Sequence, residues 1–528
     1  MNHNFSQVPS ADIPRSQFDR SHGFKTTFDA GFLVPVFTDE ILPGDTFNLN
    51  MTAFGRLSTP LHPFMDNLFI DSFFFFVPMR LIWNNWQKFN GEQNAPGDST
   101  DYLIPKMNKT LAPLSTTGYT SQSLSDYFGI PTLVPGFDHD SHYHRAYNLV
   151  YNEWFRDENL QDPANVPKGD GPDNPADFVL LRRGKRHDYF TSALPWPQKG
   201  PAVPLPLTGN ALVYRNTSMY ATTPQQIRNI DGSISAGGLT LGTTGIAAGA
   251  FGVSPVNKYL DPNGTMVADL SSVTAATINQ LRQSFQIQKL YERDARGGTR
   301  YTEIVRSHFG VISPDARLQR PEYLGGGSDA INVNPIAQTA PTTGGSTPQG
   351  NLAAMGTLSF SGHGFTKSFT EHGVIIGLVS VRADLNYQQG LDRRFSRQIR
   401  WDFYWPALSH IGEQTILNKE IYLQGSAAPS VDAAAFGYQE RYAEYRYKPS
   451  LITGKFRSND PQTLDSWHLA QKFAALPTLS SAFIVENPPV SRVVAVNTEP
   501  QFLFDSYFRL ICARPMPVYS VPGLIDHF

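Results

Sequence analysis

Four consecutive phenylalanines, Phe73 to Phe76, restrict the fold of this chain more than any other feature of its sequence. They lie inside a short apolar stretch that runs from Phe69 to Val77. Successive side chains of a β-strand point to opposite faces, so this run places large rings on both faces. The pattern therefore predicts a strand that is covered on both sides, as in the middle of a β-sandwich.

Two further stretches alternate between apolar and polar residues, as strands with one buried face do. The first runs from Thr46 to Leu57, and the second runs from Phe502 to Cys512 and is followed by Pro515 and Pro517. Strands therefore lie near both ends of the chain, with a long and mixed middle between them. We expect a sandwich whose first and last strands pair and whose loops carry large insertions.

Helical periodicity is clear in only a few places. Aromatic and apolar side chains recur at steps of three and four from Tyr143 to Phe155, which predicts an amphipathic helix. A second helix is predicted from about residue 274 to Arg296, where Gly297 and Gly298 supply a C-terminal cap. The expected class is therefore all-β with helical and loop insertions.

The composition favours a loop-rich protein with a largely covered surface. Charged residues form only 17% of the 528 residues, and 42 glycines and 40 prolines imply many turns. The net charge of -3 argues against a protein whose whole surface binds nucleic acid, but it allows a local basic patch. We expect partners to cover much of the surface.

Cysteine content and hydropathy argue against an intramolecular disulfide, a signal peptide and a membrane span. Cys512 is the only cysteine, so no intramolecular disulfide can form. The first residues lack the basic and apolar stretches of a signal peptide, and the best apolar run, Gly373 to Val381, is too short to span a bilayer. We therefore expect neither secretion by that route nor membrane insertion.

Two stretches are poor in charge and rich in Gly, Ser, Thr and Ala. They run from Thr208 to Ala276 and from Gly325 to Leu358, and such a composition is typical of flexible linkers. The first stretch is long and keeps scattered aromatic and branched residues, which favours an ordered excursion there.

No enzyme motif occurs, so no catalytic residue and no cofactor is expected. The sequence has no Gly-x-Ser-x-Gly, His-Glu-x-x-His or Cys-x-x-Cys. The one cluster typical of a metal site is the run from Asp138 to His144, in which His139, His142 and His144 lie close to two carboxylates, Asp138 and Asp140. The alternative is that these residues open a helix, with acidic and serine side chains as caps, and we favour that interpretation.

Three segments mix cations with aromatic rings, a combination that holds single-stranded nucleic acid without reading its sequence. The candidate DNA-contacting cations are Arg182, Arg183, Lys185, Arg186, Arg393, Arg394, Arg397, Arg400, Arg441, Arg446 and Lys448. Arginine and tyrosine are also frequent at subunit interfaces, and for each segment we favour subunit contact over DNA contact.

Long motifs across the chain resemble one family. The stretches that carry the resemblance are Phe18 to Gly31, Val36 to Phe47, Glu292 to Glu303, Asp315 to Gly326, Phe436 to Lys448 and Ala513 to Phe528. They are similar to microvirus major capsid proteins, specifically those of the gokushovirus group.

The resemblance implies an eight-stranded viral jelly roll that assembles into a T=1 icosahedral shell of about 60 copies. The shell would enclose a circular single-stranded DNA genome and form in the cytoplasm of a bacterial host. The implied partners are an internal scaffolding protein, a minor DNA-delivery protein and a host cell-surface receptor. One insertion would form a host-attachment protrusion at the three-fold axes, and Thr208 to Ala276 is the matching excursion.

The expected organisation has three parts. Residues 1–130 would form an N-terminal arm and the first strands, residues 131–300 the large insertions, and residues 301–528 the remaining strands, loops and tail. Two alternatives remain open at this point. A receptor-binding spike protein would need far fewer copies, and a jelly-roll enzyme or sugar-binding protein would need a carboxylate pair or metal cluster in a cleft.

Overall fold

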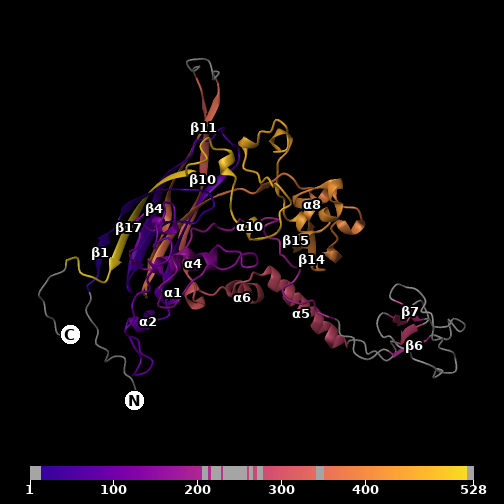
Figure 1. The fold of residues 1–528 in the computed structure, drawn as a ribbon, viewed down its shortest axis with the longest axis horizontal. Helices are drawn as coiled ribbons and strands as arrows, with labels where there is room; N and C mark the ends of the chain where they lie inside the picture. Colours follow the sequence, from indigo (N-terminus) through magenta and orange to yellow (C-terminus); the bar gives the residue numbers. More distant parts are fainter. Residues whose placement is uncertain are drawn as a thin grey trace. The chain divides into compact units, whose positions relative to one another are not determined.

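The computed structural model describes residues 14–204, 277–339 and 350–519, together with the backbone of four short strands between 212 and 269. Two compact units divide the chain (Figure 1). The first unit combines Met1–Pro197 with Asp294–Phe528, and the second is Gln198–Arg293. The larger unit contains the sandwich and all three cation-rich segments.

Antiparallel strands of the first unit form one continuous nine-stranded sheet, which divides between β10 and β11 into two halves that we call the two sheets of the sandwich. The strands of one sheet are, in spatial order, β2 (His22–Phe28), β17 (Phe502–Arg514), β4 (Thr46–Leu57) and β11 (Leu352–Ser368), with β1 (Ser16–Asp19) also paired to β17. The strands of the other are β3 (Val34–Ile41), β12 (Gly373–Ala383), β5 (Leu68–Pro78) and β10 (Glu322–Ala337).

This strand order is that of a jelly roll, because the chain crosses from one sheet to the other at nearly every connection. The strands β2, β4, β11 and β17 belong to one sheet, and β3, β5, β10 and β12 belong to the other. The predicted all-β class with insertions is therefore confirmed. The first and last strands also pair as expected, since β17 lies between β2 and β4.

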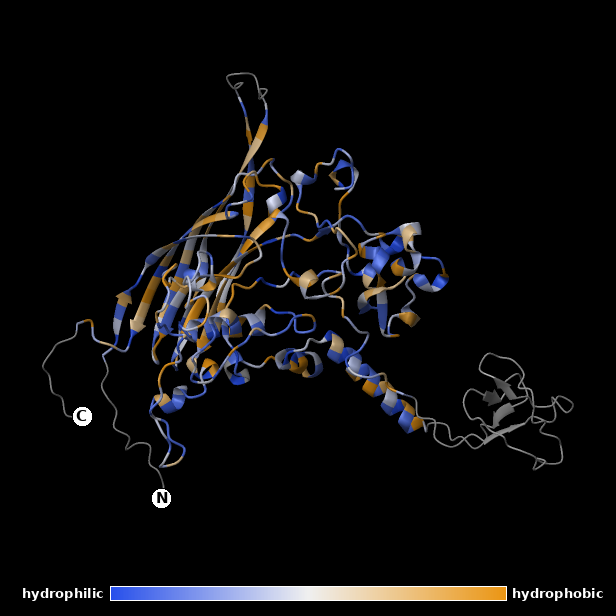
Figure 2. Cartoon of the chain, in the orientation of Figure 1, coloured by the Kyte–Doolittle hydropathy of each residue, from blue (hydrophilic) through white to orange (hydrophobic). Residues whose placement is uncertain are grey.

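Hydrophobic and hydrophilic residues alternate along strands of the sandwich (Figure 2), and the burial of the strands follows this pattern. Along β4 buried and exposed residues alternate almost without exception, and β17 repeats that alternation over most of its length. In β5 the phenylalanines are buried or half-buried on both faces, since one face meets the other sheet and the other face meets a helix. All three predicted strands are confirmed.

The two sheets join through the hairpin of β10 and β11. The first part of β10 pairs with β5, whereas the last part of β11 pairs with β4. Gly326 and Gly327 let β10 lie close to Ser72 of β5 and His363 of β11. A Cβ at Gly326 would collide with the Ser72 carbonyl oxygen, and a Cβ at Gly327 would collide with the His363 ring. The linker interpretation of residues 325–337 and 352–358 is therefore wrong, since these glycines serve packing in strands.

Residues 79–321 form the insertion between β5 and β10, which we call the first insertion. Its helices are α1 (Met79–Ile82), α2 (Trp86–Phe89), α3 (Leu124–Tyr127), α4 (His142–Trp154), α5 (Ile278–Arg296), α6 (Tyr301–Phe309) and α7 (Asp315–Leu318). The predicted helix at 143–155 is confirmed as α4, which packs on β5 and β12 through Tyr147 and Val150. The second predicted helix is confirmed as α5.

A buried ion pair fixes α4 within the first insertion. The Arg145 guanidinium donates to both carboxylate oxygens of Asp173, at 2.6 and 2.7 Å, and to the Ile82 carbonyl oxygen at 3.0 Å. Both side chains are buried. The pair therefore ties α4 to the end of α1 and to the loop that carries Asp173.

Residues 384–501 form the insertion between β12 and β17, which we call the second insertion. Its elements are β13 (Asn386–Tyr387), β14 (Glu413–Leu417), α8 (Asn418–Ile421), α9 (Pro429–Asp432), β15 (Ala435–Glu440), β16 (Ser450–Leu451) and α10 (Ser481–Ile484). A separate apolar cluster contains Ile416, Ile421 and Phe436 together with Tyr189 and Phe190 of the first insertion.

In the second unit the four short strands pair antiparallel, β6 (Leu212–Arg215) with β9 (Met266–Asp269) and β7 (Ile227–Asn229) with β8 (Lys258–Leu260). The rest of the proposed protrusion, Thr208 to Ala276, lies outside the described residues.

Candidate nucleic-acid interface

Two of the three cation-rich segments meet on the second insertion. The Arg441 guanidinium donates to the Trp401 carbonyl oxygen at 3.0 Å, and the ring centres of Tyr404 and Tyr442 lie 5.3 Å apart. Six rings here are between 39% and 68% exposed, which is unusual for side chains of this size. We call these rings the aromatic surface; they are Phe395, Trp401, Phe403, Tyr404, Trp405 and Tyr445.

Short 3-10 turns hold these rings outward. The turns are Arg393–Phe395, Arg400–Asp402 and Pro406–Leu408. Asp402 accepts the backbone N–H groups of Gln398 and Ile399, at 2.8 and 3.0 Å. These hydrogen bonds from Gln398 and Ile399 also hold the pKa of Asp402 below its usual range. Because local side chains satisfy the backbone, the segment needs no sheet partner and its rings stay exposed.

Part of the cation set in this region is structural. Arg393 donates to Glu420 at 3.0 Å and to the Thr415 carbonyl oxygen at 2.7 Å. The Arg397 guanidinium lies 3.6 Å from Glu444 and 4.5 Å from the centre of the Tyr445 ring. These two cations hold the second insertion together and are not available to bind an external phosphate.

Other cations lie among the exposed rings. The Arg400 guanidinium is 4.3 Å from the Trp405 ring centre and 5.2 Å from that of Trp401. Arg394 lies over Phe395 and 3.3 Å from Asp392, and Arg446 pairs with Glu440. Lys448 is exposed, and no ion pair to it is found within the described ranges.

Beside the aromatic surface is a hollow of about 390 Å³. It is lined by Tyr404, Tyr442 and Tyr445, by Arg446, and by Ser409 and His410. Flat rings and one cation at the edge of a hollow suit an unpaired base and its phosphate.

The first cation-rich segment lies elsewhere, and three of its four cations are anchors. Arg182 donates to the Ala30 carbonyl oxygen at 2.8 Å and lies 3.9 Å from the Phe32 ring centre. Arg183 donates to Asp71 on β5 at 2.5 Å. Lys185 is buried over the Phe483 ring, and this burial lowers the pKa of its ammonium group. Arg186 alone is exposed.

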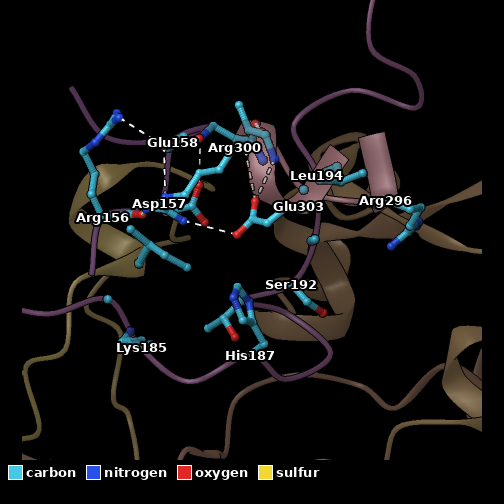
Figure 3. A pocket seen from close by; sticks show the side chains of 18 of the residues that line it. Arg156, Asp157, Glu158, Lys185, His187, Ser192, Leu194, Arg296, Arg300 and Glu303 are labelled. Carbon is cyan, nitrogen blue, oxygen red and sulfur yellow. Dashed lines mark hydrogen bonds and ion pairs between the residues drawn. The ribbon is translucent and has the colours of Figure 1, made fainter. Parts of the chain in front are cut away.

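Arg186 borders a polar cleft with a volume of about 1060 Å³ (Figure 3). The end of α4, residues 183–187, the turn from α5 into α6, and the side chains of Glu440 and Tyr447 line it. For the side chains of Arg186, His187 and Arg306, no ion pair or hydrogen bond is found among the described residues. The segment 440–447 thus borders both this cleft and the tyrosine-lined hollow.

Part of the cleft wall is built from residues 295–303. Arg300 lies 3.1 Å from Glu158 and donates to the Arg156 carbonyl oxygen at 2.8 Å. Glu303 accepts the Thr299 and Arg300 N–H groups at 3.0 and 3.1 Å, which starts α6 (Figure 3). Burial raises the pKa of Glu158 despite its neighbouring arginines. Sequence reasoning missed this cleft, although the two glycines between arginines in that stretch signalled a tight turn.

The three candidate metal ligands have separate partners. The His139 Nε2 atom lies 2.8 Å from the Tyr119 hydroxyl, His142 Nδ1 lies 2.9 Å from Asp140, and His144 Nε2 lies 2.9 Å from the Ser125 hydroxyl. No group of three or more metal-ligand side chains converges among the residues described here. Burial lowers the pKa of His144 to about 3, so this ring is neutral.

Comparison with known proteins decides the family. A family model described as capsid protein (F protein) matches residues 6–524. Capsid protein VP1 of Bdellovibrio phage phiMH2K is 51% identical, with 100% of this chain and 98% of the relative covered. The chain belongs to the microvirus major capsid proteins.

Two further capsid proteins named VP1 match at full length. That of Chlamydia phage 1 is 44% identical over 99% of this chain and 98% of its own, and that of Spiroplasma virus 4 is 38% identical over 99% and 97%. The major capsid proteins of microviruses are structural proteins of the virion and are not enzymes. Within the described ranges, the helices are all too short or too polar to cross a membrane.

Proposed function

We propose that this capsid protein forms a T=1 icosahedral shell of about 60 copies around a circular single-stranded DNA genome. Full-length similarity to three capsid proteins and the jelly-roll strand order support the proposal. A jelly roll leaves its loops free to lengthen into neighbour contacts, and here two loops have become large insertions. Assembly takes place in the cytoplasm of the bacterial host, with an internal scaffolding protein and a minor DNA-delivery protein as partners.

The aromatic surface is the observation that carries the DNA part of the proposal. Exposed rings and exposed cations alternate there, and single-stranded DNA offers unpaired bases and phosphates to match them. Of the candidate cations, those left exposed are Arg186, Arg394, Arg400, Arg446 and Lys448. These cations and the aromatic surface would face the genome inside the shell.

The excursion Thr208 to Ala276 would form the protrusion at the three-fold axes and attach the particle to a host receptor. It falls within a compact unit of its own, Gln198–Arg293, which supports a role separate from the shell wall. Its low charge fits a surface that recognises a partner by shape and hydrogen bonds.

Electron microscopy and nuclease protection on the same gradient fraction test the shell and the genome together. We expect uniform icosahedral particles that hold protected, circular single-stranded DNA. Small oligomers alone, even after co-expression with a scaffolding partner, would overturn the proposal.

Replacing residues 208–276 with a short Gly-Ser linker tests the protrusion. We expect DNA-filled particles that no longer adsorb to host cells. Adsorption at the normal level would refute the attachment role, and loss of all particles would show that the segment serves the shell.

The competing role for the aromatic surface is subunit contact, because exposed rings and arginines also anchor interfaces. Ultraviolet crosslinking of intact virions, followed by mass spectrometry, separates the two roles. We expect nucleotide adducts on peptides that contain residues 394–405 and 442–446. Adducts confined to other peptides would favour subunit contact.

A further inference from the structure

The hairpin of β10 and β11 continues as a two-stranded ribbon beyond the two sheets (Figure 1). Residues 322–331 of β10 pair with β5, and residues 357–368 of β11 pair with β4. Among the described strands, residues 332–337 and 352–356 pair only across the hairpin, with Ala337 opposite Leu352. We call residues 332–337 and 352–357 the ribbon; Thr357, at its base, also pairs with Arg56 of β4.

One face of the ribbon is turned toward the protein and the other is exposed. Val333 packs against the main core and Ala354 is buried. On the opposite face Ile336 is 49% exposed and Met355 is 42% exposed. The register places Ile336 opposite Ala353 and Met355 opposite Asn334, so Ile336 and Met355 are diagonal neighbours on one face.

The ribbon lacks the features that usually keep an exposed hairpin free of partners. No Asp, Glu, Lys or Arg occurs from residue 330 to residue 366. Edge strands in water are commonly protected by such charges, and a two-stranded ribbon without further cover is marginally stable. Pro335 removes one N–H group from the β10 edge, but residues 352–357 contain no proline.

We propose that the ribbon is a contact surface for a second copy of this chain, through the face that carries Ile336 and Met355. The inference rests on the proposed shell, in which each subunit meets several neighbours. A nucleic acid would require cations, and the ribbon has none. Uncharged apolar and amide side chains instead match the core of a protein interface.

The dimensions of the ribbon fit part of a subunit contact. Six residues per strand span roughly 20 Å, and two strands are about 10 Å wide. The exposed face and edges therefore offer a few hundred Å², on the order of half of one partner's share of a standard interface. The contact would also supply the cover that the ribbon lacks in the isolated subunit.

A pair of double variants tests this contact. Ile336→Lys with Met355→Lys places two charges on the exposed face, whereas Ile336→Thr with Met355→Thr places uncharged residues of high strand propensity there as a control. We expect the lysine variant to lower the particle yield about tenfold or more, and the threonine variant to stay within about threefold of the original chain. Normal particle yield from the lysine variant would overturn the contact.

Hydrogen exchange on the unmodified protein gives an independent result if the lysine variant does not fold. Amides of residues 332–337 and 352–357 should exchange about tenfold or more slowly in particles than in unassembled subunits. Equal exchange rates in particles that form normally would overturn the ribbon contact and leave the shell proposal intact. Absence of particles from the unmodified protein would overturn both.

Discussion

The sandwich and the two insertions are stabilised in different ways. In the sandwich, apolar side chains from both sheets interlock, as where the Phe74 ring lies 6.2 Å from Phe37 and 5.7 Å from Phe365. In the first insertion, α4 is anchored by the buried ion pair of Arg145 and Asp173. The sandwich therefore relies mainly on many apolar contacts, whereas each insertion combines an apolar cluster with buried ion pairs.

This difference decides how each region responds to substitution. A core ring makes many weak contacts, so a change of similar shape loses little. A buried ion pair behaves otherwise, since removal of one partner leaves an uncompensated charge in a dry environment. Breaking a buried ion pair should therefore lower the stability of the subunit most, and breaking an exposed pair should lower it least.

Arg145→Met should destabilise the unassembled subunit by about 3–5 kcal/mol, because Asp173 would remain buried without its partner. The urea midpoint of unfolding measures this loss. As a matched control, Arg145→Met combined with Asp173→Leu should recover most of the lost stability, since both charges are then replaced by apolar groups. If the double variant is as unstable as the single variant, Arg145 and Asp173 stabilise the subunit by more than mutual neutralisation of their charges.

Trp401→Ala should weaken binding of the unassembled subunit to a short oligothymidylate by about 1–3 kcal/mol, through loss of stacking on one base. Fluorescence titration with a labelled oligonucleotide measures the change. Phe54→Ala is the matched control, because Phe54 is an exposed ring on β4 of the sandwich. Equal losses in the two variants would mean that binding is not specific to the aromatic surface.

Acid should loosen the first insertion before the sandwich. Burial lowers the pKa of His144 to about 3, whereas an unfolded histidine titrates near about 6.5. Between those values the unfolded chain binds the proton and the folded chain does not, so stability falls by about 1.4 kcal/mol per unit of falling pH.

The variant His144→Gln should lose this part of the pH dependence. His139, whose pKa burial also lowers, keeps its own contribution in the variant. Urea midpoints at pH 7.5 and 5.5, together with hydrogen exchange of α4 and β4, measure the effect. Identical pH slopes in the variant and the original chain would contradict the assignment to His144.

Lys25→Ala should change stability by about 0.5 kcal/mol or less. The Lys25 ammonium lies 3.2 Å from Asp505, but the two side chains are 79% and 52% exposed, so water screens the pair. Thermal unfolding of the unassembled subunit measures this effect. A loss as large as that of Arg145→Met would mean that exposure does not separate the two kinds of ion pair.

Patterns local to one segment could be predicted from the sequence. The alternation from Thr46 to Leu57 was enough to predict β4, because one buried face leaves that mark on consecutive residues. The run Phe73 to Phe76 likewise predicted a strand covered on both sides. The pairing of β4 with β17 was also expected, but the order of the other strands could not be predicted from the residues, because alternation does not say which strands pair.

Long-range partners also limited the prediction of the candidate site. The three cation-rich segments were identified, but Arg183 is paired with Asp71 and Arg393 with Glu420, both distant in sequence. Whether a cation is an anchor or a free donor depends on such partners. The linker interpretation of residues 325–337 and 352–358 was wrong for a related reason, since Gly326 and Gly327 allow close packing to Ser72 and His363.

Because β17 lies between β2 and β4, this sheet can be completed only near the end of translation. A ribosome that adds roughly 5–20 residues per second needs roughly 25–100 seconds to reach Phe502. Until then the growing chain carries β2 and β4 without the strand that joins them. A truncated translation product consequently lacks the centre of one sheet, and we expect such incomplete chains to be excluded from the shell.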